Sequence, residues 1–396
     1  MSWFAIGSLA GWLVVVLCAR LRSAPYAVFR GITLGLHSLI LAGVVGRFGA
    51  LLPLAIYLHV AVHVHSLALI NPRLRPLWYR ALVSIPASFF SAGTLLAWPW
   101  ALLHAFSFEL PGVFVPYVLA LVGVAQSLLT RSEEFDIVVR DGDVGDSVRR
   151  HRSSALRVAR PLRIVQITDP HLGPFMSVAR LRQICERAVG RDPDLILLTG
   201  DYLTMESQSD PALLATALEP LKALPGRVFG CFGNHDHEAP SIVRAAFRSI
   251  GATLLIDDQA FVDTPAGRVQ ILGYDFAFRG RKEHLAKVSA AYPREPGALR
   301  LALLHDPGAF KHLPKGEADL VLSGHTHGGQ VGLVSVGLPW TMLRVFMNAP
   351  DHGLWASGAS RLYVHRGTGH YGFPLRLGVP AEDSLLRVHP AGALGG

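Results

Sequence analysis

Five long apolar segments fill the chain from its N-terminus to Thr130, and this feature constrains the fold more than any other. A membrane-crossing helix needs about 20 apolar residues, and this stretch contains one acidic residue, Glu109, with no lysine and no aspartate. The second segment contains Arg47, whose long side chain can reach the membrane surface. We therefore expect residues 1–130 to form a multi-span membrane domain of about five helices, at 3–19, 31–52, 48–70 (overlapping the second), 81–106 and 111–130.

The arginines of this part indicate an orientation. Basic residues accumulate in cytoplasmic loops, and the loops that follow the second and fourth segments carry only Arg47 and Glu109. The other loops hold the remaining basic residues, namely Arg20, Arg22, Arg30, Arg73, Arg75, Arg80 and Arg131. Five spans then place the N-terminus outside and the chain after Thr130 in the cytoplasm. We expect a multi-pass protein of the cell inner membrane, and no cleaved signal peptide, because no basic region precedes the first segment.

Composition excludes several classes of protein. The hydrophobic fraction of 51% is too high for a disordered chain. A pI near 9.7 is typical of nucleic-acid binding, but residues 1–130 carry +6 of the net charge of +8, so we expect no nucleic-acid partner. Cys18, Cys185 and Cys231 are odd in number and form no CxxC pair, which excludes a disulfide framework. The lipid bilayer is the partner that this composition predicts.

After residue 130 the pattern changes to short strands that alternate with helices. Residues 131–160 form a charged, mixed-sign linker with one short outer strand at 135–139. Alternating strands and helices over residues 161–390 predict an α/β domain, and residues 391–396 form a tail. The expected strands lie at 163–168, 195–199, 227–232, 253–256, 268–272, 301–304 and 320–323, and the expected helices at 178–189, 211–223 and 240–250.

Five short motifs rich in His and Asp follow five of these apolar strands. In open α/β sheets, ligands bind beyond the carboxyl ends of the strands, so we expect these side chains to meet at one edge. Two pairs, Asp169 with His171 and His325 with His327, have a spacing of two, which places both side chains on one side of an extended segment. The motifs are Asp169-Pro-His171, Gly200-Asp201, Gly233-Asn234-His235-Asp236, His305-Asp306 and Gly324-His325-Thr326-His327.

This set of side chains predicts a metal site. Imidazole, carboxylate and amide groups without a thiolate suit Mn²⁺, Fe or Zn²⁺ better than a structural thiolate zinc. Seven ligands are too many for one ion, whereas sharing one carboxylate makes two sites of four. Two metals about 3.5–4 Å apart suit in-line displacement at phosphorus. Each motif taken singly is weak, and the prediction depends on their joint occurrence.

The motif series resembles the calcineurin-like metallophosphoesterase superfamily, and Gly324-His-Thr-His-Gly-Gly-Gln330 resembles its membrane-tethered bacterial branch. That branch includes proteins similar to UDP-2,3-diacylglucosamine pyrophosphatase. The resemblance covers about residues 160–385 and implies a four-layer αββα sandwich. It also implies one metal held by Asp169, His171, Asp201 and His327 and a second held by Asp201, Asn234, His305 and His325.

The same resemblance implies that His235 contacts the phosphate and protonates the leaving oxygen, a role that needs a proton held near neutral pH. One position departs from the pattern. Many relatives place an acid three residues after the bridging aspartate to orient the histidine, and this chain has Thr204 there and Glu206 two residues further on. The residue that orients His235 therefore remains open at the level of sequence.

Residues 333–346, LVSVGLPWTMLRVF, follow the last metal ligands and are almost entirely apolar. They are either a buried strand and helical turn or an apolar lip that admits acyl chains beside the metals. The second interpretation favours a lipid-linked phosphoester or pyrophosphate such as UDP-2,3-diacylglucosamine. The alternatives are a general phosphodiesterase or phosphomonoesterase on soluble nucleotides, and a membrane sensor or transporter with a regulatory phosphoesterase domain. The last would need more polar residues inside the spans than the scattered histidines and Arg47.

Overall fold

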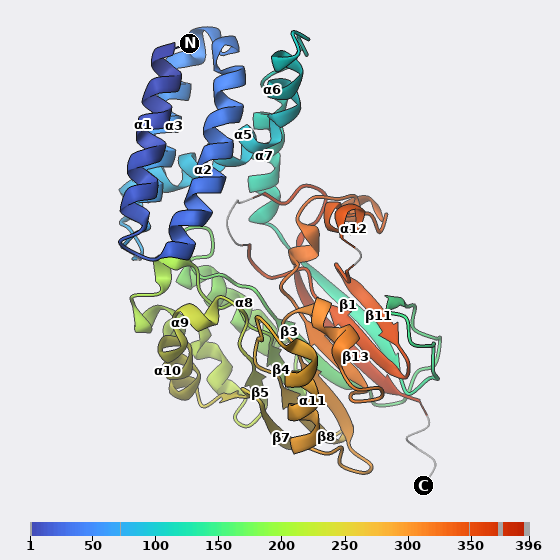
Figure 1. Ribbon diagram of the computed structural model, residues 1–396. Coiled ribbons are helices and arrows are strands. Elements are labelled where there is room, and N and C mark those ends of the chain that lie inside the picture. Colours follow the sequence, from blue (N-terminus) through green and yellow to red (C-terminus); the bar gives the residue numbers. More distant parts are fainter. Residues whose placement is uncertain (1, 72, 348, 371–374, 392–396) are drawn as a thin grey trace. The chain divides into compact units, whose positions relative to one another are not determined.

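A computed structural model describes residues 2–71, 73–347, 349–370 and 375–391 (Figure 1). The chain divides into two compact units. The first comprises the described residues up to Leu128 together with Met205–Ser209 and 375–377, and the second contains the remaining described residues.

The first unit is helical. Two of its helical stretches, Ala24–Arg47 and Gly49–Ala68, are long and apolar enough to cross a membrane, and Leu77–Leu96 with Trp98–Ala105 forms a further candidate that is bent by 47°. Pro99 at the start of the second half explains the bend, because it has no N–H to continue the helix. The helices are α1 (Ser2–Ala19), α2 (Ala24–Val44), α3 (Leu52–Ala68), α4 (Leu77–Tyr79), α5 (Ile85–Leu96), α6 (Trp98–Ala105) and α7 (Val115–Ser127).

All five expected apolar segments are helical, but their limits differ from the expectation. The second helix begins at Ala24 instead of residue 31, because Ser23 caps it by accepting a hydrogen bond from the Tyr26 N–H. Helices α1 and α7 are shorter than the candidates above. A helix rises about 1.5 Å per residue, so α7 extends only about 20 Å, whereas a bilayer core is about 30 Å thick. Five spans therefore remain a prediction.

Histidines of the third apolar segment take part in packing inside the first unit. His59 lies between two hydrogen-bond partners, the Ser8 hydroxyl at 3.0 Å and His37 Nε2 at 3.2 Å. His63 Nδ1 donates to the His59 carbonyl at 2.9 Å. These bonds satisfy buried polar groups between helices α1, α2 and α3.

The second unit contains two sheets, counted over the described residues. The six-stranded sheet has the order β1 (Thr130–Val139), β13 (Ala381–Pro390), β3 (Leu162–Ile167), β4 (Leu195–Leu198), β5 (Val228–Gly230) and β6 (Thr253–Leu254). The seven-stranded sheet has the order β2 (Arg149–Arg150), β11 (Gly353–Ser357), β12 (Ser360–Val364), β10 (Leu320–Ser323), β9 (Leu299–Leu303), β8 (Gly267–Gly273) and β7 (Asp258–Thr264).

Three apolar cores hold the layers of this unit together. Between the sheets, Leu195 and Leu197 of β4 face Leu301 and Leu303 of β9. On the outer face of the first sheet pack α8 (Val178–Gly190), α9 (Pro211–Leu218) and α10 (Pro240–Ile250). On the outer face of the second sheet pack α11 (Arg281–Ala291) and the 3-10 helix η7 (Pro307–His312). The arrangement is the expected four-layer αββα sandwich (Figure 1).

The segment expected as a linker contributes two strands to the sandwich. Strand β1 occupies its beginning and pairs in parallel with β13, from Thr130 opposite Ala381 to Val139 opposite Pro390. Strand β2, later in the same segment, joins the edge of the second sheet through β11. The sequence pattern also did not reveal β7, β11, β12, β13 and α11, because polar residues interrupt their apolar periodicity.

Candidate metal centre

The five motifs lie at the carboxyl ends of five strands, β3, β4 and β5 in one sheet and β9 and β10 in the other. Strands β3, β4 and β5 run parallel, and so do β9 and β10. The ends of parallel strands meet at one sheet edge, so both sheets deliver their motifs to the same region. The site is therefore built from loops that leave two packed sheets.

The backbone of these loops is unusual. Five of the eight expected site residues have a positive φ, from 46° at His171 to 67° at His325. Non-glycine residues rarely adopt this left-handed conformation, and the other three that do so here are Asp169, Asp201 and His327. The spacing argument for Asp169/His171 and His325/His327 is thus wrong in its reason, because neither pair lies in extended backbone. Such strain of about 1–3 kcal/mol per residue persists where the surrounding structure fixes it and is concentrated at functional sites.

One group of ligand atoms comes from the Asp169 motif and His327. The Nε2 atoms of His171 and His327 lie 3.2 Å apart, and Asp169 Oδ1 lies 3.8 Å from the first and 3.4 Å from the second. All three side chains are buried. Convergence of two imidazole nitrogens and one carboxylate oxygen within this space could hold a metal ion.

A second group comes from Asp201, His305 and His325. Asp201 Oδ2 lies 3.2 Å from His305 Nε2 and 3.7 Å from His171 Nε2, which belongs to the first group. The imidazole rings of His305 and His325 meet edge to face at 5.0 Å between centroids. Asp201 therefore lies between the two groups, where a shared carboxylate would have to be.

Asn234 supplies a further indication that the residues fit a metal. In the part of the chain that the structure describes, no donor reaches the buried Oδ1 of Asn234. A buried amide oxygen without a partner costs about 1–3 kcal/mol, and a divalent cation satisfies it. The donor set of imidazoles, carboxylates and one amide oxygen is the set that Mn²⁺, Fe and Zn²⁺ accept.

Neighbouring groups orient these side chains. His305 Nδ1 donates to the Thr199 carbonyl at 2.6 Å, which directs Nε2 toward Asp201. The Asp169 carboxylate accepts the His325 N–H at 3.0 Å and the Thr168 hydroxyl at 2.8 Å. Hydrogen bonds of this type fix the ring or carboxylate orientation in metal sites.

Electrostatics within the cluster are strong. Burial raises the pKa of the Asp169 carboxyl to about 6 and lowers the pKa of His171 to about 3. For His305, burial is outweighed by the carboxylates of Asp201 and Asp169, which raise its pKa to about 10. These shifts arise because buried carboxylates and imidazoles lie close together, and bound divalent cations would compensate the charge of the carboxylates.

Two glycines keep the loops close to the carboxylates. A Cβ at Gly324 would lie 2.1 Å from Asp169 Oδ2, and a Cβ at Gly233 would lie 2.2 Å from Asp201 Oδ1. Both distances are far inside van der Waals contact, so no side chain fits without moving a predicted ligand. The glycines of the two motifs are required by close approach.

The structure answers which residue orients His235. Its Nδ1 lies 2.9 Å from Glu238 Oε1, in the following 3-10 turn. The Thr204 hydroxyl instead donates to the Leu172 carbonyl, and Glu206 lies in the first unit, 3.9 Å from His65. Burial lowers the pKa of His235, but the hydrogen bond to Glu238 and the Asp201 carboxylate outweigh it, so the pKa is raised.

Asp236 belongs to one of the five motifs, and its role, which the motif alone did not indicate, is structural. Its carboxylate accepts the N–H groups of Asp201, Tyr202 and Gly233, at 2.7, 2.9 and 2.7 Å. These bonds tie the loop after β4 to the loop after β5. The signal for both Asp236 and Glu238 lay in the motif Gly-Asn-His-Asp-His-Glu, whose acids follow His235 by one and three residues.

The apolar lip of residues 333–346 is exposed, and it is joined firmly to the metal-ligand loop. Buried Asp351 makes the connection: its carbonyl accepts the Thr326 hydroxyl, and its Oδ2 accepts the Thr341 hydroxyl, both at 2.6 Å. Thr341 caps α12 (Met342–Phe346), and Leu343 of this helix packs on Gly329, where a Cβ would lie 2.8 Å away. The lip is thereby anchored to the loop that carries His325 and His327.

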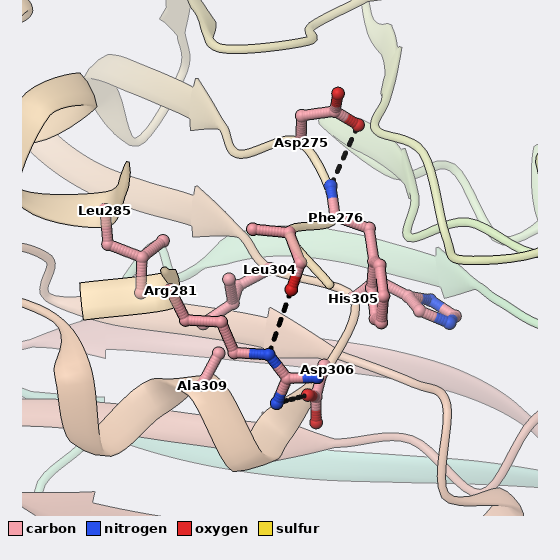
Figure 2. Close-up of a pocket in the computed structure, with 9 residues that line it drawn as sticks. Asp275, Phe276, Arg281, Leu285, Leu304, His305, Asp306 and Ala309 are labelled. Atoms are coloured by element: carbon pink, nitrogen blue, oxygen red, sulfur yellow. Dashed lines mark hydrogen bonds and ion pairs between the residues drawn. The ribbon is translucent and has the colours of Figure 1, made fainter. Parts of the chain in front are cut away.

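A small cavity of about 10 Å³ lies behind His305 (Figure 2). Arg281 lines it and binds Asp306 at 2.5 Å and the Ala277 carbonyl at 3.0 Å. Figure 2 shows the His305 imidazole directed away from this arginine. The cavity has room for about one water molecule, so it is too small to admit a substrate. The residues that line it pack behind His305.

Comparisons with known proteins agree with this site. The model of the family described as calcineurin-like phosphoesterase matches residues 162–329, which include all the ligand candidates. Phosphodiesterase YaeI of Escherichia coli is 30% identical over 244 residues, covering 60% of this chain and 87% of that protein.

Other relatives are longer than the matched region. An uncharacterized metallophosphoesterase of Helicobacter pylori is 28% identical, covering 59% of this chain and 61% of its own length. A transmembrane protein with metallophosphoesterase domain from Danio rerio is 30% identical, covering 58% of this chain and 54% of its own length. The chain thus spans only part of these two relatives.

Proposed function

Since this chain belongs to the calcineurin-like phosphoesterase family and is a phosphate ester hydrolase, we propose that it uses two divalent metal ions to hydrolyse a lipid-linked phosphoester or pyrophosphate. UDP-2,3-diacylglucosamine is the specific substrate proposed. The observation that carries this is the lip: seven large apolar side chains between residues 333 and 346 are about half exposed or more, on a segment fixed to the metal-ligand loop.

The chain's own residues define the chemistry. Asp169, His171, Asp201 and His327 would hold one ion, and Asp201, Asn234, His305 and His325 the other. Bound divalent ions supply Lewis acidity and an activated water at neutral pH. His235, held at Nδ1 by Glu238, can present Nε2 to the leaving oxygen and deliver its proton.

Membrane association follows from the two candidate helices and from relatives named as transmembrane proteins. We further propose that the chain is a multi-pass protein of the inner membrane with the second unit in the cytoplasm. The distribution of arginines after the first and third apolar segments supports this orientation.

A second candidate function is hydrolysis of soluble phosphodiesters, which the name of YaeI supports. The two are separated by assays of the purified full-length protein with Mn²⁺, in which UMP release from a UDP-diacyl-sugar is compared with turnover of bis-(p-nitrophenyl) phosphate. Asp201→Ala is the matched inactive control.

We expect rapid UMP release that Asp201→Ala abolishes. Turnover of only the soluble diester would replace the lipid substrate by the second candidate. Absence of both activities in a protein with metals bound would favour a sensor role.

A further inference from the structure

The lip has the chemistry of a surface that lies in a bilayer. Val336, Val345 and Phe346 are 70%, 64% and 75% exposed. Soluble proteins rarely expose a contiguous apolar surface of this kind without a partner. Trp340 and Arg344 add an aromatic ring and a guanidinium group, which are enriched where a protein meets lipid headgroups.

Charge around the lip complements anionic headgroups. Residues 331–350 contain one basic residue, Arg344, and no acidic residue. Arg131 is exposed and makes no ion pair or side-chain hydrogen bond within the described ranges. Basic residues at such positions favour binding to an anionic membrane surface.

Apolar and basic groups meet in a hollow beside the lip. Its volume is about 350 Å³. Its lining includes Val334, Leu338 and Pro339 of the lip, the arginines Arg131, Arg150 and Arg366, and the carboxylates of Glu133 and Glu382. Arg150 is paired with Asp351 at 2.7 Å, and Arg366 is paired with both glutamates. Arg131 is therefore the arginine of this lining that is available to a ligand phosphate. The hollow thus offers apolar side chains of the lip and one available guanidinium group to the head and first methylenes of a phospholipid.

The short chain segment between α7 and β1 also favours the bilayer as the partner of this surface. Arg131 follows the end of apolar helix α7, at Ser127, by four residues. Strand β1 therefore begins within a few residues of α7, a helix expected in the membrane.

We propose that residues 333–346 insert into the bilayer interface, with Arg131 and Arg344 at the level of the headgroups. Removing an acyl chain from a bilayer costs free energy for every methylene that leaves it. A lip seated in the interface lets the tails of a lipid substrate remain in the bilayer while its phosphate reaches the metals. This access route rests on the proposed function, whereas the bilayer contact is measured without turnover.

The experiment places a fluorescent label at Val345→Cys in full-length protein in nanodiscs of phosphatidylcholine and phosphatidylglycerol. Cys18→Ser serves as background, because Cys185 and Cys231 are fully buried. Phe261→Cys, at a 40% exposed position on β7, is the matched control. Quenching is measured with a lipid carrying a doxyl group near the headgroup and with aqueous iodide, and thermal unfolding checks that each variant folds.

We expect the doxyl lipid to quench the label at Val345→Cys at least about twofold more than at Phe261→Cys, with the reverse order for iodide. Equal iodide access at both positions and no doxyl quenching would overturn the proposal. Shielding that appears only after a diacyl substrate is added would also overturn it, while leaving the lipid substrate supported. Doxyl quenching without lipid turnover would retain the membrane contact and remove the substrate proposal.

Discussion

At the scale of single residues, the site depends on backbone positions that few side chains tolerate. Asp169, Asp201 and His327 have φ of 50°, 58° and 50°. Their neighbours Gly324 and Gly233 leave no room for a Cβ. The strained backbone and the close approach of the glycines allow the carboxylates and imidazoles to converge. The loops are therefore shaped for binding and not for maximal stability.

Glu238 is predicted to hold His235 in its productive orientation. Glu238→Gln keeps a hydrogen-bonding group but removes the charge that raises the pKa of His235, so that pKa falls. We expect kcat to decrease about 10–100-fold and the alkaline limit of the pH–rate profile to move to lower pH. Steady-state kinetics across pH measures both, with Glu206→Gln as the control. An unchanged profile in Glu238→Gln would show that another group orients the histidine.

Gly324→Ala tests the close approach to Asp169. The new Cβ must displace the carboxylate, so we expect metal affinity to fall about 10–100-fold. Metal content per chain after dialysis against a metal buffer is the measurement. Gly190→Ala is the matched control, because a Cβ there meets nothing within 4 Å. Equal metal content in the two variants would contradict the role of Gly324.

At the scale of elements, strands β1 and β13 are held in the second unit by ion pairs as well as by the hydrogen bonds of the sheet. Arg366, in the loop after β12, binds Glu382 of β13 at 2.9 Å and also binds Glu133 of β1. Burial raises the pKa of Glu382, but His365 and Arg366 outweigh it and lower the pKa to about 2. The folded pKa lies below the unfolded value of 4.5, so Glu382 stabilises the fold at neutral pH, and this contribution is lost as the pH falls from about 4.5 to 2.

Glu382→Gln is therefore predicted to destabilise the second unit at pH 7. Breaking a buried ion pair costs about 3 kcal/mol, which corresponds to about 6–10 °C in Tm for a unit of this size. Calorimetry in detergent measures the shift. The difference in Tm from the wild type should narrow below about pH 4.5. Glu134→Gln, which removes an ion pair to Arg387 from an exposed glutamate, should change Tm little. If the difference in Tm between Glu382→Gln and the wild type stayed constant with pH, the stabilising role of the Glu382 carboxylate would be contradicted.

At the scale of the whole molecule, one chain combines an apolar helical unit with an αββα phosphoesterase unit. Among the described residues, the clustered carboxylates and imidazoles of the metal centre belong to the second unit. A ligand stabilises the unit that binds it, by about 2.7 kcal/mol at 100 times its Kd. Metal loading should therefore be visible in one unfolding transition and not in the other.

Chelation by EDTA is expected to abolish hydrolysis and to lower the unfolding temperature of the second unit only. Addition of Mn²⁺ should restore both. Differential scanning calorimetry of full-length protein in detergent, run in parallel with the hydrolysis assay, provides the test. Asp201→Ala should be insensitive to the chelator, and a chelator-induced shift in that variant would place the metals elsewhere.

The resemblance to the phosphoesterase family implied the αββα layers. The sequence pattern by itself determined the division of the chain, the α/β class of its second part and the set of candidate ligands. Each of these follows from local pattern: apolar length for the helices, short apolar runs for strands such as 320–323, and polar residues directly after buried strands. The helices at 178–189 and 240–250 were predictable for the same reason, because apolar residues recur there with helical periodicity.

Only the tertiary structure decided how these parts meet. Strand β13 contains buried Glu382 and Asp383, which no apolar pattern reveals, and its place beside β1 depends on residues at the opposite end of the phosphoesterase unit's sequence. The left-handed turns at Asp169 and His325, the Glu238–His235 pair and the anchoring of the lip through Asp351 depend on how the loops fold against one another. Pairing of that kind depends on packing and compensation of buried charge, which a single sequence does not display.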